Sequence, residues 1–316
     1  MTAPVTLFVF NRPSTTQQVF DQIRAYQPSR LFVVADGPRS AADVPLCQKT
    51  RSIVEQVDWE CVVQTNYSEV NLGCNGRVIS GLTWVFDHCE ESIVLEDDCV
   101  PDPSFFLYCA ALLEMYRHDQ RVMAINGSNY QFGRRRSSYS YYFTRYAHIW
   151  GWASWRRAWQ CFTDGASDWP ALRDTSWLRD ILGDADAAAY FRIAFDSMMA
   201  GDRTWDFQWN FSCWVQNGLA VAPSTNLVSN IGFGADATNT TALTRRAGLP
   251  TVALQFPLQH PHTMVRNGEA DRFDFKQSFP SDAYHQVRRR LGAAMPSTMR
   301  AQLYSMMARL RLEGRH

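Results

Sequence analysis

Three consecutive carboxylates, Glu96, Asp97 and Asp98, follow an apolar run at residues 93–95 and form an acidic triplet. Adjacent negative charges repel one another unless a cation or solvent screens them. One of them could cap a helix expected from Pro103, but a cap explains only one carboxylate. Carboxylate oxygens suit a hard divalent cation, which keeps positions open for water and substrate phosphates. The triplet therefore predicts a site for Mn²⁺ or Mg²⁺ and a phosphorylated substrate.

Other polar residues also follow expected strands. Asn11 and Arg12 come after the strand expected at Val5–Phe10, and Asp36 comes after the strand expected at Leu31–Ala35. In doubly wound α/β sheets, ligands bind outside the carboxyl ends of the strands. We therefore expect these side chains to share one cleft with the acidic triplet.

Strand and helix patterns alternate through the first part of the chain. Apolar, β-branched runs predict five strands, and 3.6-residue periodicity predicts helices between them. This alternation predicts right-handed crossovers and an α/β fold, Rossmann-like, with a mostly parallel central sheet and helices on both faces. The predicted strands are Val5–Phe10, Leu31–Ala35, Cys61–Thr65, Ser92–Leu95 and Val122–Ile125, and the helices are Ser14–Tyr26, Asp43–Val57, Cys74–His88 and Pro103–Tyr116.

The pattern changes after about residue 130. Helical spacing recurs at Asp186–Ala200 and Asp206–Asn217, and a short strand is expected at Leu219–Ala222. Asp206 begins the second helix, where the helix dipole favours its ionised form. It could act as a general base, and the alternative is a simple helix N-cap.

The segment 148–159 is unusually aromatic. The spacing of Trp152, Trp155 and Trp159 is helical, which favours core packing for most of these rings. Trp150 or Trp152 is the candidate for contacting a carbohydrate substrate on the acceptor side of a reaction. Asp236 lies in a Gly-rich loop that could close over the site.

The chain has 316 residues, and its 31 Lys and Arg balance 31 Asp and Glu. Balanced charge argues against a general affinity for nucleic acid. No run approaches the roughly 18–20 apolar residues of a membrane span, and the N-terminus lacks a secretory signal pattern. We therefore expect a cytoplasmic protein. The arginine-rich residues 282–316 could bind an anionic membrane peripherally or form a docked helix with a solvated face.

Several short motifs resemble, in the same order, those of the N-acetylglucosaminyltransferase I family and related GT-A sugar transferases. The acidic triplet with its following Pro-Asp and Phe-Phe pairs is the most specific of them. The resemblance covers roughly residues 4 to 235. The motifs are Phe10-Asn11-Arg12, Ala35-Asp36-Gly37, Glu96-Asp97-Asp98, Ile125-Asn126-Gly127-Ser128-Asn129, Trp150-Gly151-Trp152 and Thr204-Trp205-Asp206-Phe207-Gln208-Trp209.

The resemblance implies a bacterial-type nucleotide-diphospho-sugar transferase with a GT-A fold, and it implies a role for each matched residue. Asp98 would bind the metal through a DXD-like motif, Asp97 the ribose and Glu96 the donor sugar. Arg12, beside Asn11 at the first strand exit, would contact the diphosphate, and Asp36 the base. Asp206 would be the catalytic base of an inverting transfer.

The implied activity is hexosyl or N-acetylhexosaminyl transfer, with UDP the expected nucleotide. The acceptor would be a glycan or a lipid-linked or protein-linked group in surface polysaccharide or glycoconjugate synthesis. The nucleotide-sugar half would span residues 1–130, the acceptor-side subdomain of the same GT-A domain 131–281, and a basic helical segment 282–316. Two alternatives stay open: a metal-dependent phosphohydrolase or nuclease, and a non-catalytic nucleotide-sugar-binding module.

Overall fold

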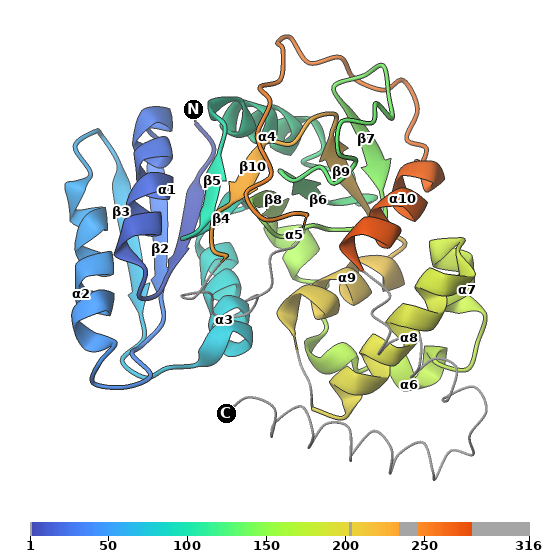
Figure 1. Cartoon of the computed structure of the whole chain (residues 1–316), viewed down its shortest axis with the longest axis horizontal. Helices are drawn as coiled ribbons and strands as arrows, with labels where there is room; N and C mark the ends of the chain where they lie inside the picture. Colours follow the sequence, from blue (N-terminus) through green and yellow to red (C-terminus); the bar gives the residue numbers. More distant parts are fainter. Residues whose placement is uncertain (1, 202–203, 234–244, 280–316) are drawn as a thin grey trace.

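The computed structural model describes residues 2–201, 204–233 and 245–279. Its centre is an eight-stranded sheet with the order β3-β2-β1-β4-β8-β6-β9-β7 (Figure 1). A second, two-stranded sheet joins β10 and β5. The strands are β1 Val5–Val9, β2 Arg30–Ala35, β3 Val62–Tyr67, β4 Glu91–Glu96, β5 Cys99–Pro101, β6 Val122–Asn126, β7 Tyr141–Thr144, β8 Trp152–Trp155, β9 Leu219–Pro223 and β10 Val228–Asn230.

The large sheet is mostly parallel. Strands β3, β2, β1 and β4 pair in parallel, and so do β6 and β9. Strand β8 runs antiparallel between β4 and β6, and β7 is antiparallel to β9 at the edge. All the strands except β7 and β8 therefore point the same way, and their carboxyl ends lie along one edge.

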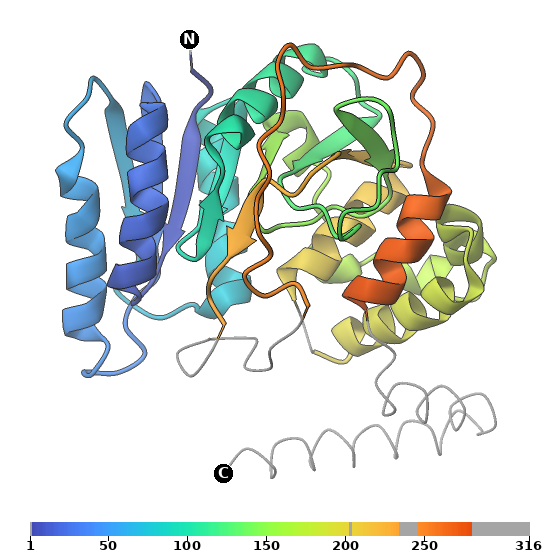
Figure 2. The same cartoon turned by 45° about the horizontal axis from the view of Figure 1, so that its top comes forward.

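Helices cover both faces of this sheet, as Figures 1 and 2 show. Side chains of α1, α4 and the 3₁₀ turn η1 pack in one core, while those of α3 and of α5 to α10 pack in the other. The helices are α1 Pro13–Tyr26, α2 Val44–Ser52, η1 Ile53–Gln56, α3 Gly73–His88, α4 Pro103–Met115, α5 Arg156–Trp159, η2 Asp164–Ala166, α6 Trp169–Leu172, α7 Trp177–Leu182, α8 Ala185–Met199, α9 Trp205–Val215 and α10 Gly268–Ser278.

The period-two pattern of the strands explains this division. In β2, Leu31 and Val33 point into the core under α1, and Phe32 and Val34 point into the core under α3. Each face is apolar because each is covered, as expected of a parallel sheet. The α/β class, the mostly parallel sheet and the helices on both faces are therefore confirmed.

The aromatic segment folds differently from the helical spacing noted in the sequence. Trp152 and Trp155 lie in strand β8, and only the short helix α5 reaches Trp159. Strand alternation sends Trp152 and Trp155 into opposite cores. The helical interpretation was wrong because antiparallel pairing with β4 and β6 decides the backbone here. Core packing of these rings is confirmed.

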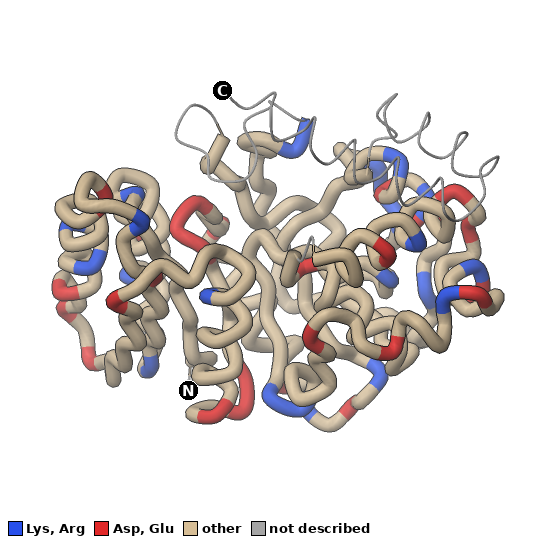
Figure 3. The backbone as a smooth tube through the Cα atoms, turned by 90° about the horizontal axis from the view of Figure 1, so that it is seen from below, with Lys and Arg blue, Asp and Glu red and all other residues tan. Residues whose placement is uncertain are grey.

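Acidic and basic residues are interspersed in both halves of the molecule (Figure 3). None of the helices within the described residues is long and apolar enough to cross a membrane. Asp236 and the basic segment 282–316 lie outside the described residues.

Candidate functional site

The acidic triplet lies where β4 ends. Glu96 is the last residue of β4, and Asp97 and Asp98 form the turn before β5. Both aspartates are buried, with exposed fractions of 3% and 7%. The helix cap is a different residue, because the Asp102 carboxylate accepts the Ser104 N–H at 2.9 Å. Capping of α4 therefore does not account for the triplet.

Arg12 is the cation at this corner. Because β1 and β4 are parallel neighbours, the chain leaving β1 runs beside the triplet. The Arg12 guanidinium donates to the Asp97 carboxylate and, from Nη1, to Asp98 Oδ2 at 2.8 Å. The backbone N–H of Phe10 donates to Asp97 Oδ2 at 3.2 Å. The predicted convergence of these two strand exits is therefore present.

One guanidinium faces three carboxylates. Glu96 is partly exposed, yet its Oε1 is buried without a hydrogen-bond partner. Burial, followed by the charges of Asp98 and Asp97, raises the pKa of Glu96 to about 8. Burial also raises the pKa of Asp97, to about 6, although the charge of Arg12 opposes it. The corner therefore carries more negative charge than Arg12 balances.

Asn230, the last residue of β10, and Gly232, just after it, complete the corner. The Asn230 amide donates to Asp98 Oδ1 at 3.3 Å. Gly232 packs so closely that a Cβ built on it would lie 1.9 Å from Asp98 Oδ2 and 2.8 Å from Arg12 Nη1. The sequence motifs did not single out either residue, because their role follows from the pairing of β10 with β5. The Asn/Gly content of this segment was the only signal.

The sequence predicted a site for Mn²⁺ or Mg²⁺ at the acidic triplet. Over the ranges that the structure describes, no three or more His, Cys, Asp or Glu are arranged to hold a metal ion. The uncompensated charge and the unpartnered oxygen of Glu96 nevertheless fit a hard cation. Such an ion would take Asp98 as its protein ligand and complete its shell with phosphate and water oxygens. The donor chemistry therefore fits a cation that binds together with a phosphorylated ligand.

Asp36 lies at the carboxyl end of β2 and is occupied by the adjacent loop. Its carboxylate accepts backbone N–H groups of Gly37 at 2.9 Å, Leu72 at 2.9 Å and Gly73 at 3.0 Å. The Asn71 amide donates a fourth bond at 3.0 Å. Asp36 therefore fixes the loop that starts α3. A nucleotide base here would meet that loop as well as Asp36.

Asn11 is directed away from the triplet. Its side-chain amide donates to Asp43 Oδ1 at 2.7 Å, and Asp43 also pairs with Arg39. Hydrogen bonding to Arg39 lowers the pKa of Asp43 to about 2. Asn11 thus connects the end of β1 to the turn before α2.

Asp206 comes from a distant part of the chain but lies close to the triplet. It occupies the first turn of α9 and is partly exposed. Burial raises the pKa of Asp206, while a hydrogen bond from Thr204 lowers it. Its charge is among those that raise the pKa of Glu96. Asp206 is therefore within electrostatic range of Glu96.

The two acceptor candidates lie in different surroundings. Trp152 has an exposed fraction of 1% and packs against Trp205 and Trp209, with ring centres 6.0 and 5.7 Å away. Trp150 is partly exposed and meets the Phe233 ring edge-to-face at 5.6 Å. Phe233 directly follows Gly232. Trp150 is therefore the ring that remains available to a ligand near Asp98.

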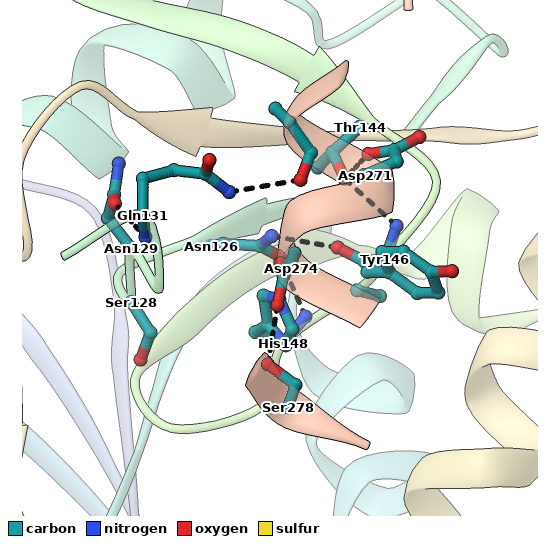
Figure 4. Close-up of polar contacts among 12 residues, drawn as sticks. Asn126, Ser128, Asn129, Gln131, Thr144, Tyr146, His148, Asp271, Asp274 and Ser278 are labelled. Carbon is teal, nitrogen blue, oxygen red and sulfur yellow. Dashed lines mark hydrogen bonds and ion pairs between the residues drawn. The ribbon is translucent and has the colours of Figure 1, made fainter. Parts of the chain in front are cut away.

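A buried polar network supports the segment that leads to Trp150 (Figure 4). The Asn126 amide donates to the Tyr146 carbonyl at 2.9 Å, and its oxygen accepts the His148 N–H at 3.0 Å. The His148 ring lies 2.6 Å from Asp274 of α10, and Thr144 donates to Asp271 of the same helix at 2.6 Å. Helix α10 thereby holds the segment at residues 144–148, which leads to Trp150, against the end of β6.

A cavity of about 920 Å³ opens elsewhere, between residues 129–140 and 249–259. None of the site residues predicted from the sequence lines it. Its lining combines Tyr139, Phe132 and Phe256 with hydroxyl and amide side chains. We place the candidate site at the acidic corner because the charged groups converge there.

Three solved enzyme structures align with parts of the chain at low similarity. Galactosyltransferase LgtC in complex with donor and acceptor sugar analogs is 9% identical, with a TM-score of 0.37 over 69% of this chain and 72% of that one. A 4-diphosphocytidyl-2C-methyl-D-erythritol synthase from Anaerococcus prevotii is 8% identical, with a TM-score of 0.36 over 70% and 88%. UDP-glucose pyrophosphorylase complexed with UDP-glucose is 12% identical, with a TM-score of 0.27 over 47% and 64%.

No family model matches the chain, and no curated protein matches it either. Structural alignments this weak establish neither a family nor an activity. The functional conclusion therefore depends on the geometry of the acidic corner.

Proposed function

We propose that the chain is a metal-assisted glycosyltransferase of the GT-A type, resembling the N-acetylglucosaminyltransferase I family. It would transfer a hexosyl or N-acetylhexosaminyl group from a nucleotide-diphosphate sugar, with UDP the expected nucleotide, to an acceptor hydroxyl. One observation carries the proposal: Arg12 pairs with Asp97 and Asp98 at the carboxyl ends of β1 and β4. Asp206 of α9 is near enough for its charge to contribute to the raised pKa of Glu96.

Arg12 and Asp98 define the expected diphosphate position. Their pairing at 2.8 Å holds a guanidinium beside a carboxylate at the edge of the sheet. Guanidinium groups bind phosphate oxygens through paired N–H donors. A bound Mn²⁺ or Mg²⁺ at Asp98 would supply charge neutralisation for a departing diphosphate. In this arrangement Arg12 would orient the phosphates. Asn230 and Gly232 keep the Asp98 carboxylate in place.

Asp206 would act as the general base of an inverting displacement. Its carboxylate takes the proton of the acceptor hydroxyl while the acceptor oxygen bonds to the anomeric carbon. The bond from that carbon to the diphosphate oxygen breaks, and the electron pair leaves with the diphosphate. Attack opposite the leaving group inverts the configuration. The raised pKa of Asp206 suits this role, because a stronger base accepts the proton more readily.

Trp150 would contact the acceptor, since its ring is partly exposed and lies beside Phe233 near the diphosphate corner. The acceptor class includes glycans and lipid-linked or protein-linked groups of surface polysaccharide synthesis. A cytoplasmic location, with peripheral membrane contact through residues 282–316, belongs to the same proposal. Asp236 remains a candidate for covering the site.

The hydrolase alternative is less favoured. A two-metal phosphohydrolase needs further carboxylates at the strand ends, and Asp36 at the end of β2 is the candidate. Its two oxygens already accept four hydrogen bonds from the loop at residues 37 and 71–73. We therefore propose group transfer to an acceptor in preference to hydrolysis.

A thermal-shift screen with UDP-, GDP-, CMP- and dTDP-sugars tests the proposal. A ligand that binds only the native state raises the melting temperature by mass action. We expect one nucleotide series to raise it in the presence of Mn²⁺ and to have a much smaller effect in EDTA. No shift with any nucleotide sugar would contradict the proposal.

A further inference from the structure

The cavity between residues 129–140 and 249–259 has the size of a ligand site. Its volume is about 920 Å³, whereas ligand-binding sites in proteins have volumes of roughly 300–1,000 Å³. The first of its two loops leads from β6 to β7, and the second belongs to the segment between β10 and α10 (Figures 1 and 2). A volume near the upper end of the range gives room for an extended ligand.

The cavity lies at the edge of the sheet that also carries the acidic corner. Asn129 lines it and follows β6, and Ser224 lines it and follows β9. Both strands run in the same direction as β4, at whose end the acidic triplet lies. In open α/β sheets, ligands bind outside the carboxyl ends of the strands. The cavity is therefore on the edge where a substrate is expected.

Two short links join the cavity wall to Asp98. Asn226 lines the cavity, and Asn230, four residues later in the chain, donates to Asp98 Oδ1 at 3.3 Å. Four residues of chain span at most about 14 Å. Gly248, which precedes the lining residue Leu249, donates its N–H to the Asn230 carbonyl at 2.9 Å. A ligand of a few linked rings could therefore occupy the cavity and reach the acidic corner.

Hydrogen bonds tie the loop at residues 249–259 to the sheet at both ends. Near its start, the Thr225 hydroxyl donates to the Val252 carbonyl at 2.8 Å. At its end, the Gln259 N–H donates to the Ser140 hydroxyl at 2.8 Å. The space between these two attachments is thus part of the fold. A preformed site loses less conformational freedom when a ligand binds.

Aromatic rings form part of the lining and are supported from outside it. Phe132, Tyr139 and Phe256 line the cavity, and Phe256 has an exposed fraction of 43%. The Arg245 guanidinium lies 4.5 Å from the Phe132 ring centre, and the His262 ring meets Tyr139 edge-to-face at 5.7 Å. Neither Arg245 nor His262 is a lining residue. The negative face of an aromatic ring attracts the polarised C–H groups on the face of a sugar ring.

The polar part of the lining is almost entirely neutral. The hydroxyls of Ser138 and Ser224 and the side-chain amide of Gln259 form no hydrogen bond with any other described residue. Over the described part of the chain, Arg135 is the one charged lining residue, and its Nε donates to the Ser137 carbonyl at 3.0 Å. A diphosphate or an acidic glycan would need more cations than this. Hydroxyl and amide groups instead suit the hydroxyls of neutral sugars.

We propose that this cavity binds neutral sugar units of the acceptor that lie beyond the sugar receiving the transferred group. The enzyme would thereby select oligosaccharide acceptors over monosaccharides. This inference rests on the proposed glycosyltransferase function and identifies the acceptor class. Phe256 stacks on a sugar ring, and the hydroxyl and amide groups of the lining bond to sugar hydroxyls. Phe256 is thus a specificity-determining residue away from the reacting atoms.

The test compares F256A with L107A. Leu107 of α4 has an exposed fraction of 54% and does not line the cavity, so L107A controls for the loss of an exposed apolar side chain. The labelled full-length protein is applied, with and without UDP and Mg²⁺, to an array of neutral and acidic glycans from monosaccharides to hexasaccharides. Hydrogen exchange measured by mass spectrometry then locates the best-bound glycan on wild type.

We expect wild type to bind a neutral oligosaccharide more tightly than the corresponding monosaccharide and to show slower exchange at residues 129–140 and 249–259. F256A should weaken that binding by about tenfold, because it removes a stacked ring. L107A should bind as wild type does. UDP affinity and the melting temperature should be the same in all three proteins, because Phe256 is exposed and outside the acidic corner.

Absence of binding to every neutral oligosaccharide would overturn the inference, and so would a preference for acidic glycans. Unchanged oligosaccharide binding by F256A, or slower exchange confined to residues outside the two loops, would overturn it as well. UDP-sugar binding is measured separately on the same proteins. Failure of wild type to bind any UDP-sugar would contradict the proposed function, whatever the glycan array shows.

Discussion

Asp206 lies close enough to Glu96 for its charge to raise the pKa of Glu96, although Asp206 lies in the first turn of α9 and Glu96 ends β4. Both residues are partly exposed, although the Oε1 atom of Glu96 is buried. This relationship joins the acceptor side of the site to the donor side. Under the proposed function, Asp206 would act as the base and Asp98 would bind the cation.

Replacing Asp206 with Asn should reduce transfer by about 10²–10⁴-fold while nucleotide-sugar binding is retained, because Asn keeps the shape but cannot accept the proton. Initial rates and calorimetric binding would measure the two effects. D184N is the matched control, since Asp184 caps α8 and is not among the proposed site residues. Turnover of D206N at the wild-type rate would disprove the assignment.

The dependence of kcat/KM on pH should also report the ionisation of Asp206. Burial raises the pKa of Asp206 above its ordinary value. The base works only when ionised, so kcat/KM should fall as the pH decreases through this raised pKa. Residual activity of D206N should lack that acid limb. The same limb in wild type and D206N would assign it to another group.

Replacing Arg12 with Ala should destabilise the fold by about 3–5 kcal/mol, because it leaves the buried carboxylate of Asp97 without its partner. Urea unfolding at neutral pH would measure the change. Arg24 pairs with Asp58 at the surface, so R24A should change stability little. If R12A unfolds at the wild-type urea concentration, the buried pair has no structural role.

Replacing Gly232 with Ala should lower kcat/KM on the order of 10²-fold, because the new Cβ would lie 1.9 Å from Asp98 Oδ2 and displace the carboxylate. G76A is the control. A Cβ at Gly76 in α3 meets only Leu72 Cβ at 3.6 Å, and Ala stabilises a helix interior by roughly 0.5–1 kcal/mol. Wild-type kinetics in G232A would show that Asp98 is not constrained there.

Asp271 should make stability depend on pH. Burial raises its pKa from 3.8 to about 6 in the folded state. Between these values the folded protein binds more protons than the unfolded chain, so stability falls as the pH rises from about 4 to 6. The free energy of unfolding that is lost over this pH range amounts to about 3 kcal/mol.

Unfolding free energies of wild type and D271N across this pH range would measure the effect as a difference. The free energy of unfolding of wild type minus that of D271N should decrease with rising pH and level off above about pH 6. Glu269 lies exposed on the same helix, so E269Q should follow wild type. A difference that is independent of pH would show that Asp271 has an ordinary pKa.

Much of the parallel sheet could be predicted because β1, β2, β4 and β6 are largely apolar and buried, and because the helices have clear periodicity. The convergence of Arg12 with the acidic triplet also followed from sequence, since neighbouring parallel strands end at the same edge. Strand β8 could not be predicted in this way. Its Trp152 and Trp155 suit a helix and a strand equally, and pairing with strands from distant segments decides between them.

The rest of the site depends on long-range packing. Gly232 and Asn230 reach Asp98 because β10 pairs with β5. Arg246 contacts the ring of Trp150 from a distant part of the sequence. Neither contact leaves a local pattern in the sequence. Asp206 was found because its surrounding aromatic motif resembles a known segment, and its electrostatic effect on Glu96 required the structure.

Binding of Mn²⁺ tests most directly whether Asp98 holds a cation that binds the donor diphosphate. Electron paramagnetic resonance would measure free Mn²⁺ as protein and UDP are added to wild type, D98N and the control D102N. We predict that wild type and D102N bind Mn²⁺ together with UDP and that D98N loses at least about tenfold in affinity. Equal Mn²⁺ binding by D98N, or UDP binding to wild type that is unchanged by EDTA, would contradict the account.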